Sequence, residues 1–326
     1  MNLLITGGAG YIGSHMVKFA RSRGHTVTVL DNLSTGFRDA LPTGVLLEGS
    51  LLVPEDIRAT LASSRFDGVI HFAGSIQVGE SMRLPLKYYT ENTIGTINLL
   101  AGCVEAEVKH VVFSSSAAVY GQPMVDVIDE SCPTAPINPY GRTKLIGEQM
   151  LADCAVAHGL TSASLRYFNA AGADPAGELG ERHDPETHLI PLLLQAASGR
   201  RKSFTINGDN FPTPDGTCVR DYVHVWDLCA AHLLAMDYLM AGGATTAFNL
   251  GSGAGFSVAE VLAAAKRITG IDFPVEWGPR REGDPARLVA SRSKAERVLG
   301  WRCEYSQIET IIEHAWAWER KQTGLG

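Results

Sequence analysis

The sequence is poor in cysteine and contains no long apolar run. Its six cysteines are widely separated and form no C-x-x-C pair, a pattern typical of reduced, structural thiols in the cytosol. The longest apolar stretches, such as residues 189–197, are far shorter than the roughly 20 residues that span a bilayer. No basic and apolar leader precedes the first predicted strand. We therefore expect a cytoplasmic protein that has no membrane partner and no metal site.

Positive charge is also scarce. The chain has 28 Lys and Arg residues against 35 Asp and Glu, a formal net charge of -7. Nucleic-acid phosphates require clustered Lys and Arg, so we expect no nucleic-acid partner. With 326 residues, 45% of them hydrophobic, the chain can bury a large core. This length predicts one large α/β domain with a smaller companion.

A glycine-rich turn follows the first apolar run. Residues 3–13 predict a short strand, a tight turn and the start of a helix, and Gly7, Gly10 and Gly13 fall three apart within them. The first glycine permits the turn, the second lets the backbone approach a pyrophosphate, and the third lets the helix pack on the strand. The helix N-terminus then faces the phosphates. An ordinary glycine-rich loop is the alternative interpretation.

A carboxylate follows the second predicted strand and disfavours that alternative. Residues 26–30 form an apolar strand that ends at Asp31. In a dinucleotide-binding fold, an acid here accepts hydrogen bonds from the hydroxyls of the adenosine ribose. It would repel a 2'-phosphate, so the sequence predicts NAD rather than NADP as the cofactor.

Strands and helices alternate through the first half of the chain. This alternation predicts a Rossmann-type, doubly wound parallel sheet with helices on both faces. Small residues at 71–74 follow one strand, at the sheet edge where ligands bind in such folds. The further predicted strands are residues 44–48, 67–72, 111–113 and 164–167, and the helices between them are 54–61 and 85–106.

The alternation lapses after Asn169. Gly, Pro, Asp and His dominate residues 172–188, so we expect a second domain that comprises mainly 171–326, after a first domain at 1–170. A helix at 224–240 and a strand at 247–250 predict that the chain returns to the first domain over about 219–250. We also expect a capping box at Ser257 and Glu260 and a last helix at 306–318.

Residues 138–144 open a helix that carries a candidate catalytic pair. Asn138 is a good N-cap and Pro139 suits the first turn. The spacing of four places Tyr140 and Lys144 on one face, where the ammonium group and the helix dipole favour a tyrosinate base. A plain amphipathic helix with a solvated lysine is the alternative. Ser116, at the end of a predicted strand, favours catalysis because its hydroxyl can bind a substrate alcohol beside Tyr140.

The chain resembles the extended short-chain dehydrogenase/reductases, and within them the UDP-glucose 4-epimerases. The resemblance covers nearly the whole length. It implies a Rossmann-type domain with a smaller, interleaved substrate domain, bound NAD, a UDP-sugar substrate and a homodimer formed through two helices of each subunit. The motifs that carry it are TGGAGYIGSH at 6–15, DNLS at 31–34, HFAG at 71–74, SSSAAVYG at 114–121, PYGRTK at 139–144, LRYFNAAGA at 165–173, DGTCVRDYVHV at 215–225 and PRREGD at 279–284.

The same resemblance implies roles for individual residues. The implied catalytic residues are Ser116, Tyr140 and Lys144. The implied NAD-binding residues are Gly7, Gly10, Tyr11, Ile12, Asp31, Asn32, Phe72, Ala73, Asn92, Tyr140, Lys144 and Phe168. The implied substrate-binding residues are Ser116, Asn169, Leu189, Arg220, Arg281, Asp284 and Leu288.

The implied activity is reversible inversion at C4 of a UDP-hexose through a transient 4-keto sugar. Leu288 stands where these enzymes often carry a bulkier tyrosine, so an epimerase that also, or mainly, accepts UDP-N-acetylhexosamines is the first alternative. A nucleotide-sugar dehydratase and a silent NAD-sensing regulator are further alternatives. Ser50, Ile76 and His188 depart from the family pattern, and His188 reads either as a phosphate ligand or as a loop residue.

Overall fold

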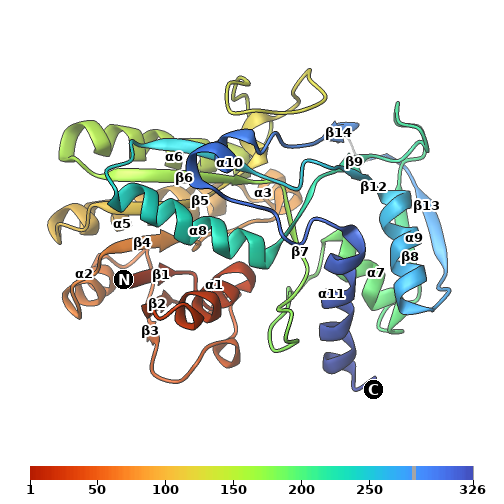
Figure 1. Cartoon of the computed structure of the whole chain (residues 1–326), viewed down its shortest axis with the longest axis horizontal. Helices are drawn as coiled ribbons and strands as arrows, with labels where there is room; N and C mark the ends of the chain where they lie inside the picture. Colours follow the sequence, from red (N-terminus) through yellow and green to blue (C-terminus); the bar gives the residue numbers. More distant parts are fainter. Residues whose placement is uncertain (281–283, 326) are drawn as a thin grey trace.

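The structure, a computed structural model, describes residues 1–280 and 284–325 and centres on a seven-stranded parallel sheet (Figure 1). The strand order is β11-β6-β5-β4-β1-β2-β3. The chain adds β2 and β3 on one side of β1 and then crosses to add β4 on the other side, so the order of addition reverses between β1 and β4. Such a reversal opens a crevice at the carboxyl ends of the strands. The predicted Rossmann-type fold is confirmed. The strands are β1 (Asn2–Thr6), β2 (Thr26–Asp31), β3 (Leu46–Glu48), β4 (Gly68–His71), β5 (His110–Ser116), β6 (Thr161–Tyr167) and β11 (Thr246–Leu250).

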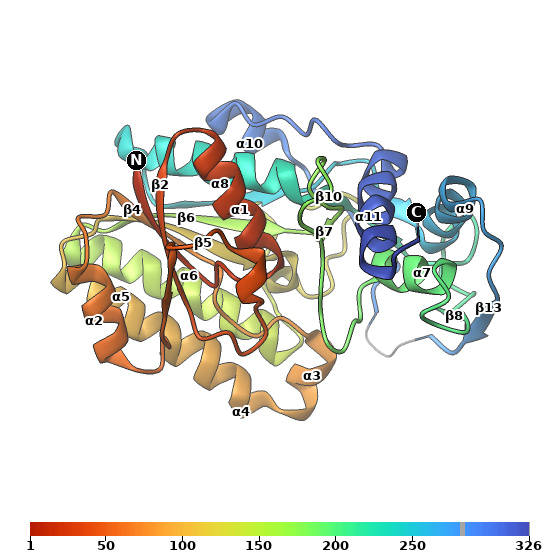
Figure 2. The ribbon, with the colours of Figure 1, turned by 90° about the horizontal axis from the view of Figure 1, so that it is seen from below.

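Helices cover both faces of the sheet (Figure 2). Alternate side chains of β1 show why: Leu3 and Ile5 enter the core under one helical layer, and Leu4 enters the core under the other. Both faces are therefore apolar, as parallel sheets require. The first layer contains α1 (Tyr11–Ser22), α8 (Val225–Met240) and α10 (Ser293–Leu299), and the second contains α2 (Pro54–Ala62), α5 (Gly95–Glu105) and α6 (Pro139–His158).

The helix predicted over 85–106 is not regular. It consists of α4 (Pro85–Tyr88), a π-helical stretch at Tyr89–Ile94 and α5. Asn92 lies within the π-helical stretch and is buried. Insertions of this kind occur frequently at functional sites, because they redirect a side chain that a regular helix would aim elsewhere. A short helix, α3 (Val78–Arg83), precedes this region and was not expected from the sequence.

A second hydrophobic core lies beyond the sheet, on the right of Figure 1. It packs α7 (Leu189–Ala197), α9 (Val258–Thr269) and α11 (Ile308–Thr323) together with two parallel strands, β8 (Phe204–Asn207) and β13 (Val275–Gly278). The capping box predicted at the start of α9 is present, since Ser257 and Glu260 hydrogen-bond reciprocally. The last helix begins at Ile308 and extends beyond the predicted 306–318.

A two-stranded parallel sheet lies between the two cores. It pairs β7 (Asn169–Ala171) with β10 (Tyr222–His224). Tyr222 enters the second core, whereas the next residue, Val223, enters the core of the large sheet. Because successive strand residues face opposite ways, these short strands are shared by both parts of the molecule.

The chain returns to the large sheet twice. β11 pairs with β6, as predicted for residues 247–250. The second return was not predicted: α10 packs on α8 and β11, and Trp301 is fully buried there, with its indole N–H donating to the carbonyl of Asp227 at 2.9 Å. Within the described residues, no helix is long and apolar enough to cross a membrane.

Candidate active site

The glycine turn is as tight as its sequence predicts. Gly7 has a φ of 72°, a conformation that favours glycine. A Cβ atom on Gly13 would lie 2.1 Å from the carbonyl oxygen of Gly7, so no side chain fits where α1 crosses β1. Gly10 is the N-cap of α1 and offers no side chain to the first turn. The N–H groups of that turn therefore point toward a ligand at the sheet edge.

Asp31 lies beside this turn. One carboxylate oxygen accepts a hydrogen bond from the N–H of Ala9 at 2.9 Å, and the other accepts one from Leu33 at 2.8 Å. The carboxylate is 9% exposed. It therefore fixes the glycine turn against the end of β2 while presenting negative charge at the place where a ribose would lie.

Asn92 joins two elements of the same crevice. Its side-chain oxygen accepts a hydrogen bond from the N–H of Ser75 at 2.7 Å, and its amide donates to Thr143 on α6 at 3.0 Å. The loop after β4, which begins with Phe72 and Ala73, is thereby held close to the helix of the candidate catalytic pair. The π-helical stretch makes this contact possible.

Ser116, Tyr140 and Lys144 converge at the carboxyl edge of the sheet. Ser116 ends β5, and α6 begins at Pro139, with the Asn138 side chain accepting from the N–H of Gly141 at 2.8 Å. The predicted cap is confirmed. The ammonium nitrogen of Lys144 lies 5.8 Å from the centre of the Tyr140 ring.

Tyr140 and Lys144 are both buried, and burial affects the pKa of each side chain. Burial raises the pKa of Tyr140, and its interaction with the Ser116 hydroxyl only partly opposes that rise. Lys144 does not reach the phenol, because its ammonium group donates to the carbonyl oxygen of Ser114 at 2.8 Å. Burial also lowers the pKa of Lys144 to about 8. Burial therefore opposes the tyrosinate that Lys144 and the helix dipole are expected to favour, and the role of Tyr140 as a base stays a prediction.

A cavity of about 220 Å³ lies beside the second core and is lined by residues of β7, β8, β10 and α7. Arg220, on β9 (Val219–Arg220), reaches it with a guanidinium group that donates to Asp284 at 2.8 Å. Asn169 also lines it and donates to the backbone carbonyl of Asp221 at 2.9 Å. Leu189, the first residue of α7, and Asp284 line it as well, whereas Ser116 and Leu288 do not. Arg281 lies outside the described residues.

Leu288 lies between the cavity and the catalytic edge. It belongs to β14 (Arg287–Leu288) and is directly paired with Arg220. Its side chain is half-buried and packs against a small cluster that includes Val119, Tyr120 and Phe168. Val119 and Tyr120 follow Ser116 in the chain, so Leu288 does not belong to the core of the second part of the molecule.

The remaining predicted residues lie around the same crevice. Tyr11 and Ile12 open α1, Asn32 follows β2, and Phe168 connects β6 to β7. The Tyr11 hydroxyl donates to the carbonyl of Gly172 at 2.7 Å, which ties the glycine turn to the start of the second part. Three residues depart from the family pattern. The backbone N–H of Ser50 donates to the Asp56 carboxylate at the start of α2, and Ile76 is exposed. The imidazole of His188 lies against two carboxylates.

One residue that organises the site was not predicted. Asp221 is fully buried, and its carboxylate accepts hydrogen bonds from Ser252, Gly253 and Ala290 at 2.7–3.0 Å. Its only sequence signal is the DYVHV segment, in which an acid precedes a short apolar strand. Burial raises the pKa of Asp221 against these hydrogen bonds.

Comparison with known proteins shows the family of this chain. A family model described as the NAD dependent epimerase/dehydratase family matches residues 3–251. The chain belongs to this family. The match spans the glycine turn, Asp31, the catalytic trio and Arg220, so the epimerase/dehydratase family accounts for the whole sheet edge described above.

Full-length relatives have the same architecture. A UDP-glucose 4-epimerase of Halalkalibacterium halodurans is 50% identical over 98% of this chain and 96% of its own length. The structure of UDP-glucose 4-epimerase from Brucella ovis in complex with NAD has a TM-score of 0.94 and 49% identity, covering 97% of both chains. The enzyme from Bifidobacterium longum in complex with NAD+ and UDP has a TM-score of 0.93 and 37% identity, covering 98% of both chains.

We predict that Gly13→Ala disrupts the dinucleotide site. The new methyl group would overlap the carbonyl of Gly7, so the turn must shift at a cost of about 1–3 kcal/mol. We expect a lower melting temperature and loss of the bound dinucleotide, measured by denaturing the purified protein and quantifying the released nucleotide.

Gly79→Ala is the matched control. Gly79 lies in the exposed helix α3, and an added Cβ atom would meet no atom within 4 Å. This variant should keep its dinucleotide and its melting temperature. A Gly13→Ala protein with wild-type dinucleotide content would show that the turn is not constrained as described.

Proposed function

We propose that this chain is a UDP-hexose 4-epimerase, which interconverts UDP-glucose and UDP-galactose with tightly bound NAD. The observation that carries the proposal is the position of the catalytic trio. Ser116 ends β5 at the carboxyl edge of the sheet, and α6 brings Tyr140 and Lys144 to the same edge, with the Lys144 ammonium 5.8 Å from the centre of the Tyr140 ring and bonded to the carbonyl of Ser114. The relatives described above are named UDP-glucose 4-epimerase, which supports the same activity for this chain.

The residues of the crevice fit NAD. The glycine turn leaves room for a pyrophosphate, and the Asp31 carboxylate suits a ribose with free hydroxyls. We assign NAD binding to the residues predicted for it, from Gly7 to Phe168. Bound NAD supplies a hydride acceptor that later returns the hydride, and its positively charged ring favours the phenolate of a nearby tyrosine.

Tyr140 is the proposed base. The phenol takes the proton of the sugar 4-hydroxyl as the hydride leaves C4, and it returns that proton when the hydride is given back to the opposite face. Ser116 binds the same hydroxyl and keeps it close to Tyr140. Lys144 holds its positive charge near the ring and fixes α6 to the end of β5 through Ser114.

Inversion at C4 requires that the sugar turns over while the nucleotide stays bound. Arg220 is permanently charged and suits a diphosphate, and Asp284 holds its guanidinium group in place. Asn169 and Leu189 line the same cavity, and we assign Arg281 to the same role from its motif. The charged contacts therefore lie on the nucleotide side, and the hexose side is left free to rotate.

Two other functions are less well supported. A dehydratase of this family needs an Asp-Glu pair to eliminate water, and alanines occupy positions 117 and 118 after Ser116. A silent NAD-sensing regulator would not need the trio. Conversion of UDP-galactose into UDP-glucose without added NAD distinguishes all three functions.

We also propose how the two parts divide the work. Residues 1–170, with the return at about 219–250, form the NAD-binding part, and residues 171–326 form most of the UDP-sugar-binding part. The two hydrophobic cores support this division, although residues 293–301 pack with the first part. A cytoplasmic location is supported by the free thiols of Cys103, Cys132, Cys154, Cys229 and Cys303.

We expect purified wild-type protein to epimerise UDP-galactose without added cofactor, and Tyr140→Phe to lower kcat by about 100- to 10,000-fold because it removes the base. The ring remains, so the dinucleotide should stay bound. Product formation by nuclear magnetic resonance measures both rates, and it would also reveal a dehydrated sugar.

Tyr238→Phe serves as the control, because the Tyr238 hydroxyl bonds only to the carbonyl of Ala244 on the surface of the described structure. It should retain the wild-type rate. A near-wild-type rate for Tyr140→Phe would refute the assignment of the base.

We propose that Leu288 sets the size of the hexose pocket. Its pairing with Arg220 and its packing on the segment after Ser116 support a place beside the sugar. Leucine is smaller than the tyrosine that resembling enzymes often carry here, so an acetamido group at C2 would fit. The enzyme should then accept UDP-N-acetylhexosamines in addition to the preferred simple hexoses.

We predict that Leu288→Tyr lowers kcat/KM for UDP-N-acetylgalactosamine by about 10- to 200-fold and affects UDP-galactose much less, because the larger ring fills the space for the acetamido group. The same substitution at Leu325, which is 43% exposed near the end of the chain, is the control. Undetectable turnover of the N-acetyl sugar by the wild type would refute the role of Leu288 and leave the epimerase assignment intact.

We propose that the protein is a homodimer formed through α5 and α6. Ile97 on α5 is 48% exposed, Ile94 at the end of the preceding π-helical stretch is 47% exposed, and Val156 on α6 is 92% exposed. Apolar side chains gathered on one helical layer mark an interaction surface. A second copy of the chain fits it, as the family resemblance implies.

Sedimentation should give a mass of about twice 35.0 kDa for the wild type. We expect Ile97→Glu to yield a monomer, because paired helices would bury the new charge. Met124→Glu, in a loop where Met124 is 98% exposed, should stay dimeric. A monomeric wild type would refute the dimer.

A further inference from the structure

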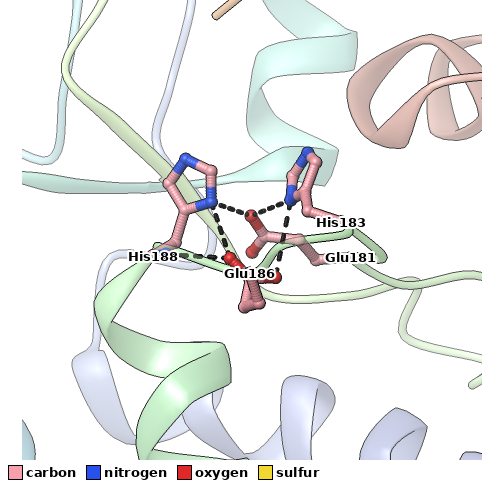
Figure 3. Close-up of side chains that lie close together, drawn as sticks. All are labelled: Glu181, His183, Glu186 and His188. Carbon is pink, nitrogen blue, oxygen red and sulfur yellow. Dashed lines mark hydrogen bonds and ion pairs between the residues drawn. The ribbon is translucent and has the colours of Figure 1, made fainter. Parts of the chain in front are cut away.

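Four ionisable side chains converge in the loop that precedes α7. Glu181, His183, Glu186 and His188 all come from this eight-residue segment, and one ligand atom from each lies within 4.8 Å of the others (Figure 3). The Nδ1 atoms of both imidazole rings face the two carboxylates (Figure 3). Residues 181–188 take no part in the proposed catalytic step.

The four ligand atoms lie close enough together to surround one ion after a small adjustment of the side chains. Nδ1 of His188 lies 2.9 Å from an oxygen of Glu181 and 2.9 Å from an oxygen of Glu186. Nδ1 of His183 lies 3.2 Å and 3.5 Å from oxygens of the same two carboxylates. A tetrahedral zinc ion with bonds of about 2.1 Å would hold its ligand atoms roughly 3.4 Å apart.

Three of the four side chains are shielded from solvent, whereas that of His188 is 41% exposed. The side chains of Glu181 and Glu186 are 6% and 5% exposed, and that of His183 is 15% exposed. Buried carboxylates need compensating positive charge. Nδ1 of His183 is buried but has no hydrogen bond of good geometry among the described residues, although its nearest neighbours are carboxylate oxygens. It is therefore placed to bind an ion in the middle of the cluster.

We propose that Glu181, His183, Glu186 and His188 form a binding site for one Zn²⁺ ion. Imidazole nitrogen and carboxylate oxygen are both zinc ligands, and a shell of four protein ligands is typical of structural zinc sites. Two carboxylates and two neutral imidazoles around a divalent cation leave no net charge. The sequence analysis predicted no metal site, because it considered cysteine spacing and not an E-x-H-x-x-E-x-H segment.

The competing state is a network of ion pairs. Burial alone would lower the pKa of His183, but the neighbouring carboxylates raise it to about 9, and Glu181 and Glu186 likewise raise that of His188 to about 10. Two imidazolium ions would then balance the two carboxylates without a metal. A zinc ion would replace their two protons at equal total charge.

The position of the site gives the ion a structural role. His188 is the N-cap of α7, and the next residue, Leu189, lines the cavity beside Arg220. Arg182, within the loop, pairs with Asp39 from the first part of the chain at 2.7 Å. An ion held by residues 181–188 would therefore fix one wall of the cavity. Glu181 and His188 also line this cavity, which the proposed function assigns to the nucleotide, but zinc binding can be measured without turnover.

The first test measures metal in the full-length protein. Protein stripped with a strong chelator should bind one equivalent of added Zn²⁺ in a calorimetric titration, and its melting temperature should rise. Cobalt(II) added to the stripped protein should give the visible absorption of a tetrahedral site without the thiolate charge-transfer band that cysteine ligands would produce. Failure of the wild type to bind zinc, or a thiolate band, would overturn the proposal.

The second test uses variants. His183→Gln and Glu186→Gln should each lose stoichiometric zinc binding and the zinc-dependent rise in melting temperature. The matched controls are His158→Gln and Glu313→Gln, both at exposed positions on helices, and they should bind zinc as the wild type does. If both cluster variants still bind one equivalent, the ion lies elsewhere and the proposal fails. Circular dichroism checks that each variant is folded.

Discussion

The buried carboxylate of Asp221 holds together the substrate side of the molecule. Its side chain accepts hydrogen bonds from the segment after β11 and from Ala290. Its backbone accepts from the Asn169 side chain and donates to the carbonyl of Leu288. Since an unpaired buried carboxylate is costly, these segments must approach together, and Arg220 is placed beside them as the preceding residue.

The opposite wall of the crevice is fixed by the parallel sheet. All strands of the large sheet point the same way, so the glycine turn after β1, Asp31 at the end of β2 and Ser116 at the end of β5 reach one edge without any long loop. α6 then lies across that edge through its cap at Asn138. The proposed catalytic residues thus lie on regular elements of the sheet edge, whereas the proposed nucleotide-binding residues lie on the short segments that bond to Asp221.

The sequence predicts the wall formed by the sheet edge better than the wall formed around Asp221. Local patterns suffice for the glycine turn, for the cap of α6 and for the spacing of Tyr140 and Lys144, because each depends on a few neighbouring residues. The π-helical stretch around Asn92 and the buried return at Trp301 depend on contacts with distant segments, which no local pattern encodes. The raised pKa of Tyr140 has the same origin, since burial is a property of the whole fold.

The chain passes repeatedly between the two hydrophobic cores. It passes from one core to the other between residues 167 and 171, 222 and 223, 250 and 261, 275 and 295, and 301 and 308. Neither part is a continuous length of polypeptide, so neither can be isolated by truncation. A wide hinge motion between the two cores would have to bend all of these connecting segments at once. The two walls of the crevice are therefore held rigidly relative to each other. The rotation that inversion at C4 requires must then come from the sugar and not from a movement of the two cores.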